Sequence, residues 1–213
     1  MKVGILGTGD VGRSLGKGFV TLGHDVKMGS RDPANAKAQE WARDAGPKAS
    51  AGAFADAAAF GHILVLATLG SANESVIRAA GVKNFSDKVV IDATNPLDHS
   101  SGTLRLFVGH TDSGGEQVQR WLPEARVVKA FNTVGNAHMF QPQFPGGPPD
   151  MFIAGNQDAA KRTMGGILKD FGWGVVDLGG IEASRALEEM CMAWCYYGFK
   201  TGGWNHAFKL LRK

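Results

Sequence analysis

The sequence predicts an α/β protein built on a doubly wound parallel sheet, with a small C-terminal α/β extension. Short apolar segments alternate with amphipathic segments along almost all of the 213 residues. A glycine-rich turn, Gly7-Thr8-Gly9-Asp10-Val11-Gly12, joins the first apolar segment to the first amphipathic one. Both observations are typical of a Rossmann-type fold, in which ligands bind at the carboxyl ends of the strands.

The first predicted strand, Val3-Gly4-Ile5-Leu6, runs directly into the glycine turn. The segment after the turn carries apolar residues at helical spacing, namely Val11, Leu15, Phe19 and Leu22. In this context Gly7 makes the tight turn, Gly9 admits a diphosphate and Gly12 allows close helix packing. Residues Gly7, Thr8, Gly9, Asp10, Val11 and Gly12 are therefore candidate cofactor-binding residues. A glycine-rich turn without a ligand is the alternative.

The end of the second predicted strand indicates which dinucleotide binds. An NAD site usually places a carboxylate there, whereas this strand ends in Gly29-Ser30-Arg31. A hydroxyl and a guanidinium match the 2′-phosphate of NADP, because arginine can bind a phosphate through two parallel hydrogen bonds. Asp32 is a competing acid that could bind a ribose. The sequence predicts NADP, with Ser30 and Arg31 on its phosphate.

The other elements follow the same alternation up to the sixth strand. We expect strands at residues 48–50, 62–67, 88–92 and 126–131. We expect helices at residues 33–45, with Asp32 as the cap, and at residues 52–60. A third helix is expected to end at residue 80, and a fourth, at residues 115–121, is expected to follow a polar loop. Because the carboxyl ends of parallel strands meet at one edge, Thr68, Asn95 and Thr133 are expected to converge on one crevice.

Residues 1–140 are predicted to form the NADP-binding domain. Residues 141–213 are predicted to form a C-terminal strand–helix extension. The segment 141–150 holds four of the eight prolines and cannot be a helix or a central strand, so it is a connector or a flap. Strands at 151–154 and 174–178 and helices at 158–171 and from Ala183 complete the chain.

Composition limits the other functions. The net charge of +3 is too small to indicate nucleic-acid binding, and no apolar run is long enough to cross a bilayer. The first strand follows Met1 directly without a signal peptide, so we expect a cytoplasmic protein. The six histidines are dispersed, which does not indicate a metal site. Cys191 and Cys195, one helical turn apart, are expected to be buried.

Three stretches carry a resemblance to a known family. They are Val3 to Asp10 continuing to Arg31, Val127 to Thr133, and Phe152 to Asn156. In this order and spacing they resemble the coenzyme F420-dependent NADP oxidoreductases, and they are similar also to the cytosolic reductase domain of STEAP-type metalloreductases. Both relatives imply hydride exchange between NADPH and a flavin-like ring. The resemblance places residues 141–213 on the acceptor side, and the first family implies a homodimer whose interface is formed by the C-terminal helices of this extension.

The resemblance also implies roles for individual residues. Thr8 to Gly12 would hold the diphosphate, and Ser30 with Arg31 the 2′-phosphate. The other implied contacts are Thr68 and Leu69 with the adenosine or linking ribose, and Asn95, Thr133 and Val134 with the nicotinamide and the acceptor ring. Asn95 has an equal alternative as a turn residue before Pro96. Hydride transfer needs no protein nucleophile, so no catalytic acid or base is assigned, and Lys129 is expected to extend its head into solvent.

The acceptor stays open between coenzyme F420 and a flavin, FMN or FAD. The turn Gly-Thr-Gly-Asp, followed by Arg13, is closer to the STEAP type, because the F420 enzymes typically carry an extra glycine and an asparagine there. The alternative function is a non-enzymatic NADPH-binding redox sensor or regulatory module, which also needs no acid–base pair.

Overall fold

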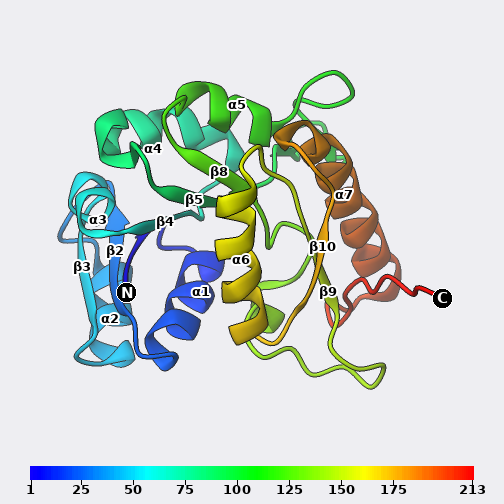
Figure 1. Cartoon of the computed structure of the whole chain (residues 1–213), viewed down its shortest axis with the longest axis horizontal. Helices are drawn as coiled ribbons and strands as arrows, with labels where there is room; N and C mark the ends of the chain where they lie inside the picture. The colour runs from blue at the N-terminus through cyan, green and yellow to red at the C-terminus, as the bar shows by residue number, and fades with distance from the viewer.

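The computed structural model describes all 213 residues and is centred on a six-stranded parallel sheet (Figure 1). The strand order is β3-β2-β1-β4-β5-β8. The bounds are β1 Lys2–Leu6, β2 Asp25–Ser30, β3 Ala49–Ala53, β4 Ile63–Leu66, β5 Val89–Asp92 and β8 Arg126–Lys129. The order reverses between β1 and β4, which is where a doubly wound sheet opens a crevice at its carboxyl edge. The predicted fold class is confirmed.

Helices cover both faces of this sheet. One face holds α1 (Asp10–Thr21), α2 (Ala36–Ala45) and α6 (Asp158–Asp170), and the other holds α3 (Phe54–Phe60), α4 (Asn73–Ala80) and α5 (Gly114–Trp121). Side chains alternate along each strand, so Ile5 joins the α1 core while Leu6 joins the α3 core. Burial on both faces explains why the central strands are apolar throughout.

The C-terminal part continues the architecture next to β8. Strands β9 (Asp150–Ile153) and β10 (Gly174–Asp177) pair in parallel, and a single antiparallel bridge joins Ala154 to Lys129 at the end of β8. Helices α6 and α7 (Ser184–Thr201) lie on the two sides of this pair (Figure 1). The Phe171 ring, just after α6, packs 4.8 Å from the Phe19 ring of α1, so the two parts of the chain share one core.

Three local expectations need correction. Helix α2 begins at Ala36 rather than at residue 33, because the Asn35 side chain accepts a hydrogen bond from the Ala38 amide at 3.1 Å and caps it. The predicted polar loop contains a short hairpin, β6 (Leu97–Asp98) with β7 (Arg105–Leu106). Strand β8 ends at Lys129, before Phe131, whose φ of +64° is incompatible with a strand.

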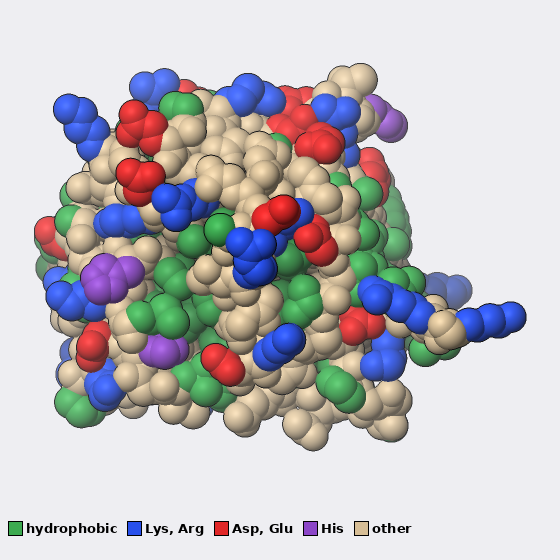
Figure 2. All heavy atoms as spheres, in the orientation of Figure 1, with side chains coloured by type: hydrophobic (Ala, Val, Ile, Leu, Met, Phe, Trp, Pro, Cys, Tyr) green, Lys and Arg blue, Asp and Glu red, His purple; other side chains and the backbone are tan.

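Figure 2 shows acidic and basic side chains interspersed over one face of the molecule, with basic side chains on the projecting C-terminal tail. None of the helices combines the length and the apolar composition that crossing a bilayer requires. Both cysteines are free and buried in α7, as predicted.

Candidate dinucleotide site

A cleft of about 810 Å³ opens at the carboxyl ends of β1 and β4. Its volume falls within the range of small-molecule and cofactor sites. Many of the predicted residues line it together: Gly7, Thr8, Gly9, Asp10, Val11, Ser30, Arg31, Thr68 and Leu69. It is also lined by Asp32, the competing acid, and by residues that the sequence did not single out: Asn35, Phe54, Ala67, Ala72, Val76 and Asn136. They come from loops and helices whose approach to the cleft depends on the tertiary fold.

The three glycines of the turn have different structural roles. Gly7 has a φ of +130°, and a side chain there would overlap the carbonyl oxygen of Ala67, the residue after β4. A side chain at Gly12 would overlap the carbonyl oxygen of Gly7. By contrast, no atom lies within 4 Å of the position that a Cβ of Gly9 would take. Gly7 and Gly12 therefore close the turn, while Gly9 leaves space on the cleft side.

The N-terminus of α1 faces this cleft without a side-chain cap. The N-cap residue is Gly9, and the first helical hydrogen bond runs from the Arg13 amide to the Gly9 carbonyl at 3.0 Å. The amides of Asp10, Val11 and Gly12 thus have no acceptor within the helix. Free amides at the positive end of a helix dipole bind anions. The turn and the helix fit a diphosphate.

Arg31 is the one basic residue that lines the cleft. Its side chain is exposed and makes no ion pair with the chain. Asp32, the competing acid, accepts a hydrogen bond from the Ala34 amide at 2.9 Å, and the Ser30 hydroxyl donates to the Asp32 carbonyl. The Ser30 proton is thus used within the turn, and it is the free Arg31 guanidinium that fits a phosphate group better than a neutral ribose.

The predicted residues of the β5 and β8 tips lie apart from the cleft lining. The Asn95 side chain donates to the backbone carbonyl of Asn132 at 2.9 Å and accepts from Asn132 Nδ2 at 3.0 Å, which ties the two tips together. Thr133 and Val134 are buried. Gly12 is buried beneath the turn. The cleft lining thus contains most of the residues expected to bind the phosphates, and also Thr68 and Leu69. Asn95, Thr133 and Val134 lie outside this lining, in the loops that follow β5 and β8.

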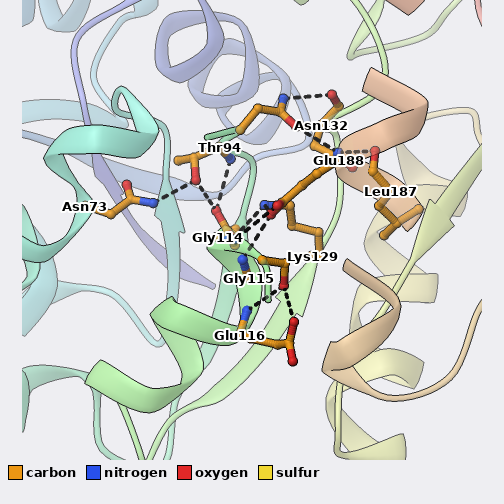
Figure 3. A network of polar contacts seen from close by, with 12 residues as sticks. Asn73, Thr94, Gly114, Gly115, Glu116, Lys129, Asn132, Leu187 and Glu188 are labelled. Carbon is orange, nitrogen blue, oxygen red and sulfur yellow. Dashed lines mark hydrogen bonds and ion pairs between the residues drawn. The ribbon is translucent and has the colours of Figure 1, made fainter. Parts of the chain in front are cut away.

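Lys129 does not extend into solvent as expected. Its side chain is fully buried, and its Nζ donates to Asp92 Oδ2 at 3.0 Å and to Glu188 Oε1 at 2.7 Å (Figure 3). Burial opposes the positive charge, but the carboxylates of Asp92 and Glu188 raise the pKa of Lys129 overall. Glu188 also accepts hydrogen bonds from the Gly114 and Gly115 amides at 3.0 Å each. The buried cluster therefore joins β5, β8, α5 and α7.

The sequence carries one signal for this cluster. Lys129 follows the apolar pair Val127 and Val128 at the end of β8, and Asp92 ends the neighbouring strand in register with it. Glu188 lies on α7, 59 residues away, and nothing local indicates that it turns inward.

The comparisons with known proteins agree with the geometry of the site. The family model described as NADP oxidoreductase coenzyme F420-dependent matches residues 2–96, which span the glycine turn and the β2 tip. An F420-dependent NADP reductase of Methanothermobacter thermautotrophicus is 30% identical over 200 residues, covering 89% of this chain and 86% of the relative. The rat metalloreductase STEAP3 is 30% identical over 190 residues, but these cover 88% of this chain and only 36% of that protein.

A solved structure gives the same result. The crystal structure of a protein from Arthrobacter sp. FB24, provisionally described as an F420-dependent NADP reductase, superposes with a TM-score of 0.94. It is 38% identical and covers all of both chains. Sequence identity over nearly the full length, together with the shared fold, shows that this chain belongs to the family of coenzyme F420-dependent NADP oxidoreductases.

Proposed function

We propose that this protein is an enzyme that transfers hydride between NADP(H) and a flavin-like acceptor, with coenzyme F420 as the first candidate. The observation that carries the proposal is the pairing of an uncapped helix N-terminus with one free arginine in the same cleft. Two anionic groups at different positions are required to match this pairing, and NADP has both a diphosphate and a 2′-phosphate. NAD has only the first.

The residues of the chain act by binding and orienting. The amides of Asp10 and Val11 hold the diphosphate, Gly9 lets it approach the backbone, and Arg31 holds the 2′-phosphate. In the reaction NADPH gives up a hydride and becomes NADP⁺, while the oxidised acceptor takes that hydride and one proton from solvent. The protein accelerates this step by fixing donor and acceptor at van der Waals distance, which needs no nucleophile.

The β5 and β8 tips are the proposed place for the nicotinamide and the acceptor ring. Asn95 is held there by its two hydrogen bonds with Asn132. Phe131 keeps a left-handed backbone at the end of β8, with a φ of +64°, a conformation that costs roughly 1–3 kcal/mol and persists only when the surroundings impose it. Strain of this kind is concentrated at functional sites, which favours a ligand near this loop.

The acceptor is tested directly by turnover. Purified protein is mixed with NADPH and, in separate reactions, with oxidised F420, FMN or FAD, and the nicotinamide absorbance is followed. We expect loss of absorbance with F420, with NADH giving a much lower rate at equal concentration. Turnover with FMN or FAD but not with F420 would replace the proposed acceptor by a flavin. Tight NADPH binding without turnover on any of the three would instead favour a sensor.

A further inference from the structure

A chain of side-chain hydrogen bonds leads from the cleft into the interior. Thr68, at the end of β4, is partly exposed and lines the cleft. Its hydroxyl donates to Asn73 Oδ1 at 2.8 Å, and Asn73 Nδ2 donates to Thr94 Oγ1 at 2.8 Å. Thr94 in turn donates to Asp92, whose other oxygen faces Lys129 (Figure 3). Asn73 and Thr94 are almost fully buried, so solvent does not compete for these bonds.

The buried end fixes the direction of every bond in this chain. Asp92 accepts from Lys129 Nζ at 3.0 Å, from the Thr94 amide at 3.0 Å and from the Thr94 hydroxyl at 2.6 Å. A hydroxyl has one proton, so Thr94 gives its proton to the carboxylate and can only accept from Asn73. This requires the NH₂ group of Asn73 to face Thr94. The oxygen of the same amide must then face Thr68.

The direction of the chain determines what Thr68 offers to the cleft. Because its proton is given to Asn73, the lone pair that remains can only accept a hydrogen bond. Phosphate oxygens are also acceptors and gain nothing from such a group. The ribose hydroxyls of a dinucleotide, by contrast, each carry a proton that they can donate to it. Without this constraint the threonine would also turn its proton into the cleft, and its lone pairs would no longer be held toward a ribose hydroxyl.

We infer that Thr68 is held as a hydrogen-bond acceptor for a ribose hydroxyl of the dinucleotide, and that Asn73 and Thr94 are positioning residues that impose this polarity. The inference rests on the proposed dinucleotide site. It adds three residues, Thr68, Asn73 and Thr94, that make one position in the cleft suited to a sugar rather than to a phosphate. The phosphates are bound by donors, the amides of α1 and Arg31, and the sugar by an acceptor.

The test is a double-mutant cycle on NADPH affinity, measured from the change in nicotinamide fluorescence on binding. Thr68→Val removes the acceptor. Thr94→Val has nearly the same shape as threonine but lets the Asn73 amide turn over, so that Thr68 points its proton into the cleft. Each variant is expected to raise the Kd for NADPH roughly fivefold to tenfold, the usual worth of one hydrogen bond. Thr68→Ser and Thr94→Ser keep the hydroxyls, and each is expected to bind NADPH more tightly than the valine variant at the same position.

The double variant separates positioning from a general loss of structure. Because Thr94 acts only through Thr68, the Kd of Thr68→Val with Thr94→Val is expected to equal that of Thr68→Val alone. A double variant whose Kd rises by the product of the two single rises would contradict the inference. So would a single valine variant that binds NADPH with the wild-type Kd. If Thr94→Val does not fold, the comparison of Thr68→Val with Thr68→Ser still decides, because equal affinities of these two would overturn the acceptor role.

A second ligand identifies which ribose is bound. Adenosine 2′,5′-bisphosphate contains the adenosine ribose but lacks the nicotinamide ribose. If Thr68→Val loses affinity for both ligands, Thr68 binds the adenosine ribose. If it loses affinity for NADPH alone, Thr68 binds the nicotinamide ribose. A wild-type protein that binds no NADPH would overturn the proposed function as well. If the wild type binds and turns over NADPH but Thr94→Val has the same Kd for NADPH as the wild type, only the positioning role of Asn73 and Thr94 would be overturned.

Discussion

The guanidinium of Arg31 reaches the cleft from the loop after β2, and no carboxylate of the chain pairs with it. A surface arginine without a partner is free to bind an incoming phosphate, and its fork of donors matches two phosphate oxygens. The acid next to it, Asp32, uses a carboxylate oxygen to stabilise its own turn. At the scale of single residues, the proposed preference for NADP therefore depends on Arg31.

Replacing Arg31 should weaken NADPH far more than NADH. We expect Arg31→Ala to cost about 1.5–3 kcal/mol of NADPH binding, roughly a tenfold to hundredfold rise in Kd, with little change for NADH. Arg31→Lys, which keeps the charge but not the paired hydrogen bonds, should fall between the wild type and the alanine variant. Fluorescence titration measures both cofactors. An equal loss for NADPH and NADH would refute the assignment.

Lys129 neutralises two buried carboxylates and should be essential for stability. Lys129→Met leaves Asp92 and Glu188 buried without their cation, and breaking a buried ion pair in this way costs about 3–5 kcal/mol. Lys169→Met, on the exposed side of α6, is the control and should change stability by less than about 0.5 kcal/mol. Urea unfolding measures both. Equal midpoints for the two variants would show that the cluster contributes nothing.

These residues differ in how far the sequence predicts them. The strand–turn–helix of Gly7 to Gly12 and the position of Arg31 after β2 depend on neighbouring residues, so a local pattern is sufficient to place them at the cleft. Lys129 has its partners 37 and 59 residues away in the chain. A lysine that lies near the end of a strand is usually solvated, and only the assembled sheet shows that α7 covers this one.

At the scale of elements, the close approach of α1 to β1 depends on the size of Gly12. A side chain there would overlap the Gly7 carbonyl oxygen and would lie 3.3 Å from Ile5 Cγ2. The overlap involves backbone, which cannot move aside without opening the turn. At Gly166 in helix α6, by contrast, there is room for a side chain, because an added Cβ would meet no atom within 4 Å.

A matched pair of alanine substitutions tests this difference. Gly12→Ala should destabilise the protein by roughly 1–3 kcal/mol because it forces an overpacked contact. Gly166→Ala should stabilise it by about 0.5–1 kcal/mol, since alanine loses less backbone entropy than glycine when a helix forms. Thermal unfolding followed by circular dichroism measures both. A Gly12→Ala variant as stable as Gly166→Ala would contradict the packing.

The boundaries of elements are where sequence and structure differ. The Asn35 cap moves the start of α2 to Ala36, although Pro33 and Asp32 are also typical of a helix start. The β6–β7 hairpin has two residues in each strand, too few to give a hydrophobic period. The longer strands and helices were predictable because each has a buried face on one or both sides of the main sheet.

At the scale of the whole molecule, α7 covers the β9–β10 pair and also presents aromatic side chains to solvent. Tyr196, Tyr197 and Phe199 are each more than half exposed, and Trp204 packs edge-on against Phe199 at 5.3 Å. Exposed apolar surface of this kind marks interaction sites in many proteins. Alternation of strands and helices predicts the doubly wound topology, but not the antiparallel bridge that joins β9 to β8.

We propose that this face of α7 forms the contact of a homodimer. The protein should then elute and scatter as twice its 22.6 kDa chain mass, and Phe199→Glu should shift it to the monomer by burying a charge in the contact. Val82→Glu, at an exposed position of a different surface element, should leave the dimer intact. Light scattering coupled to size exclusion gives the mass. A monomeric wild type at high concentration would disprove the proposal.

The central claim is that the glycine turn and Arg31 together bind the phosphates of NADP, and a crystal structure of the protein with NADPH tests it most directly. The expected result is the diphosphate against the amides of Asp10 and Val11, with the 2′-phosphate within hydrogen-bond distance of the Arg31 guanidinium. A dinucleotide bound elsewhere, or an Arg31 side chain turned away from the 2′-phosphate, would contradict the claim.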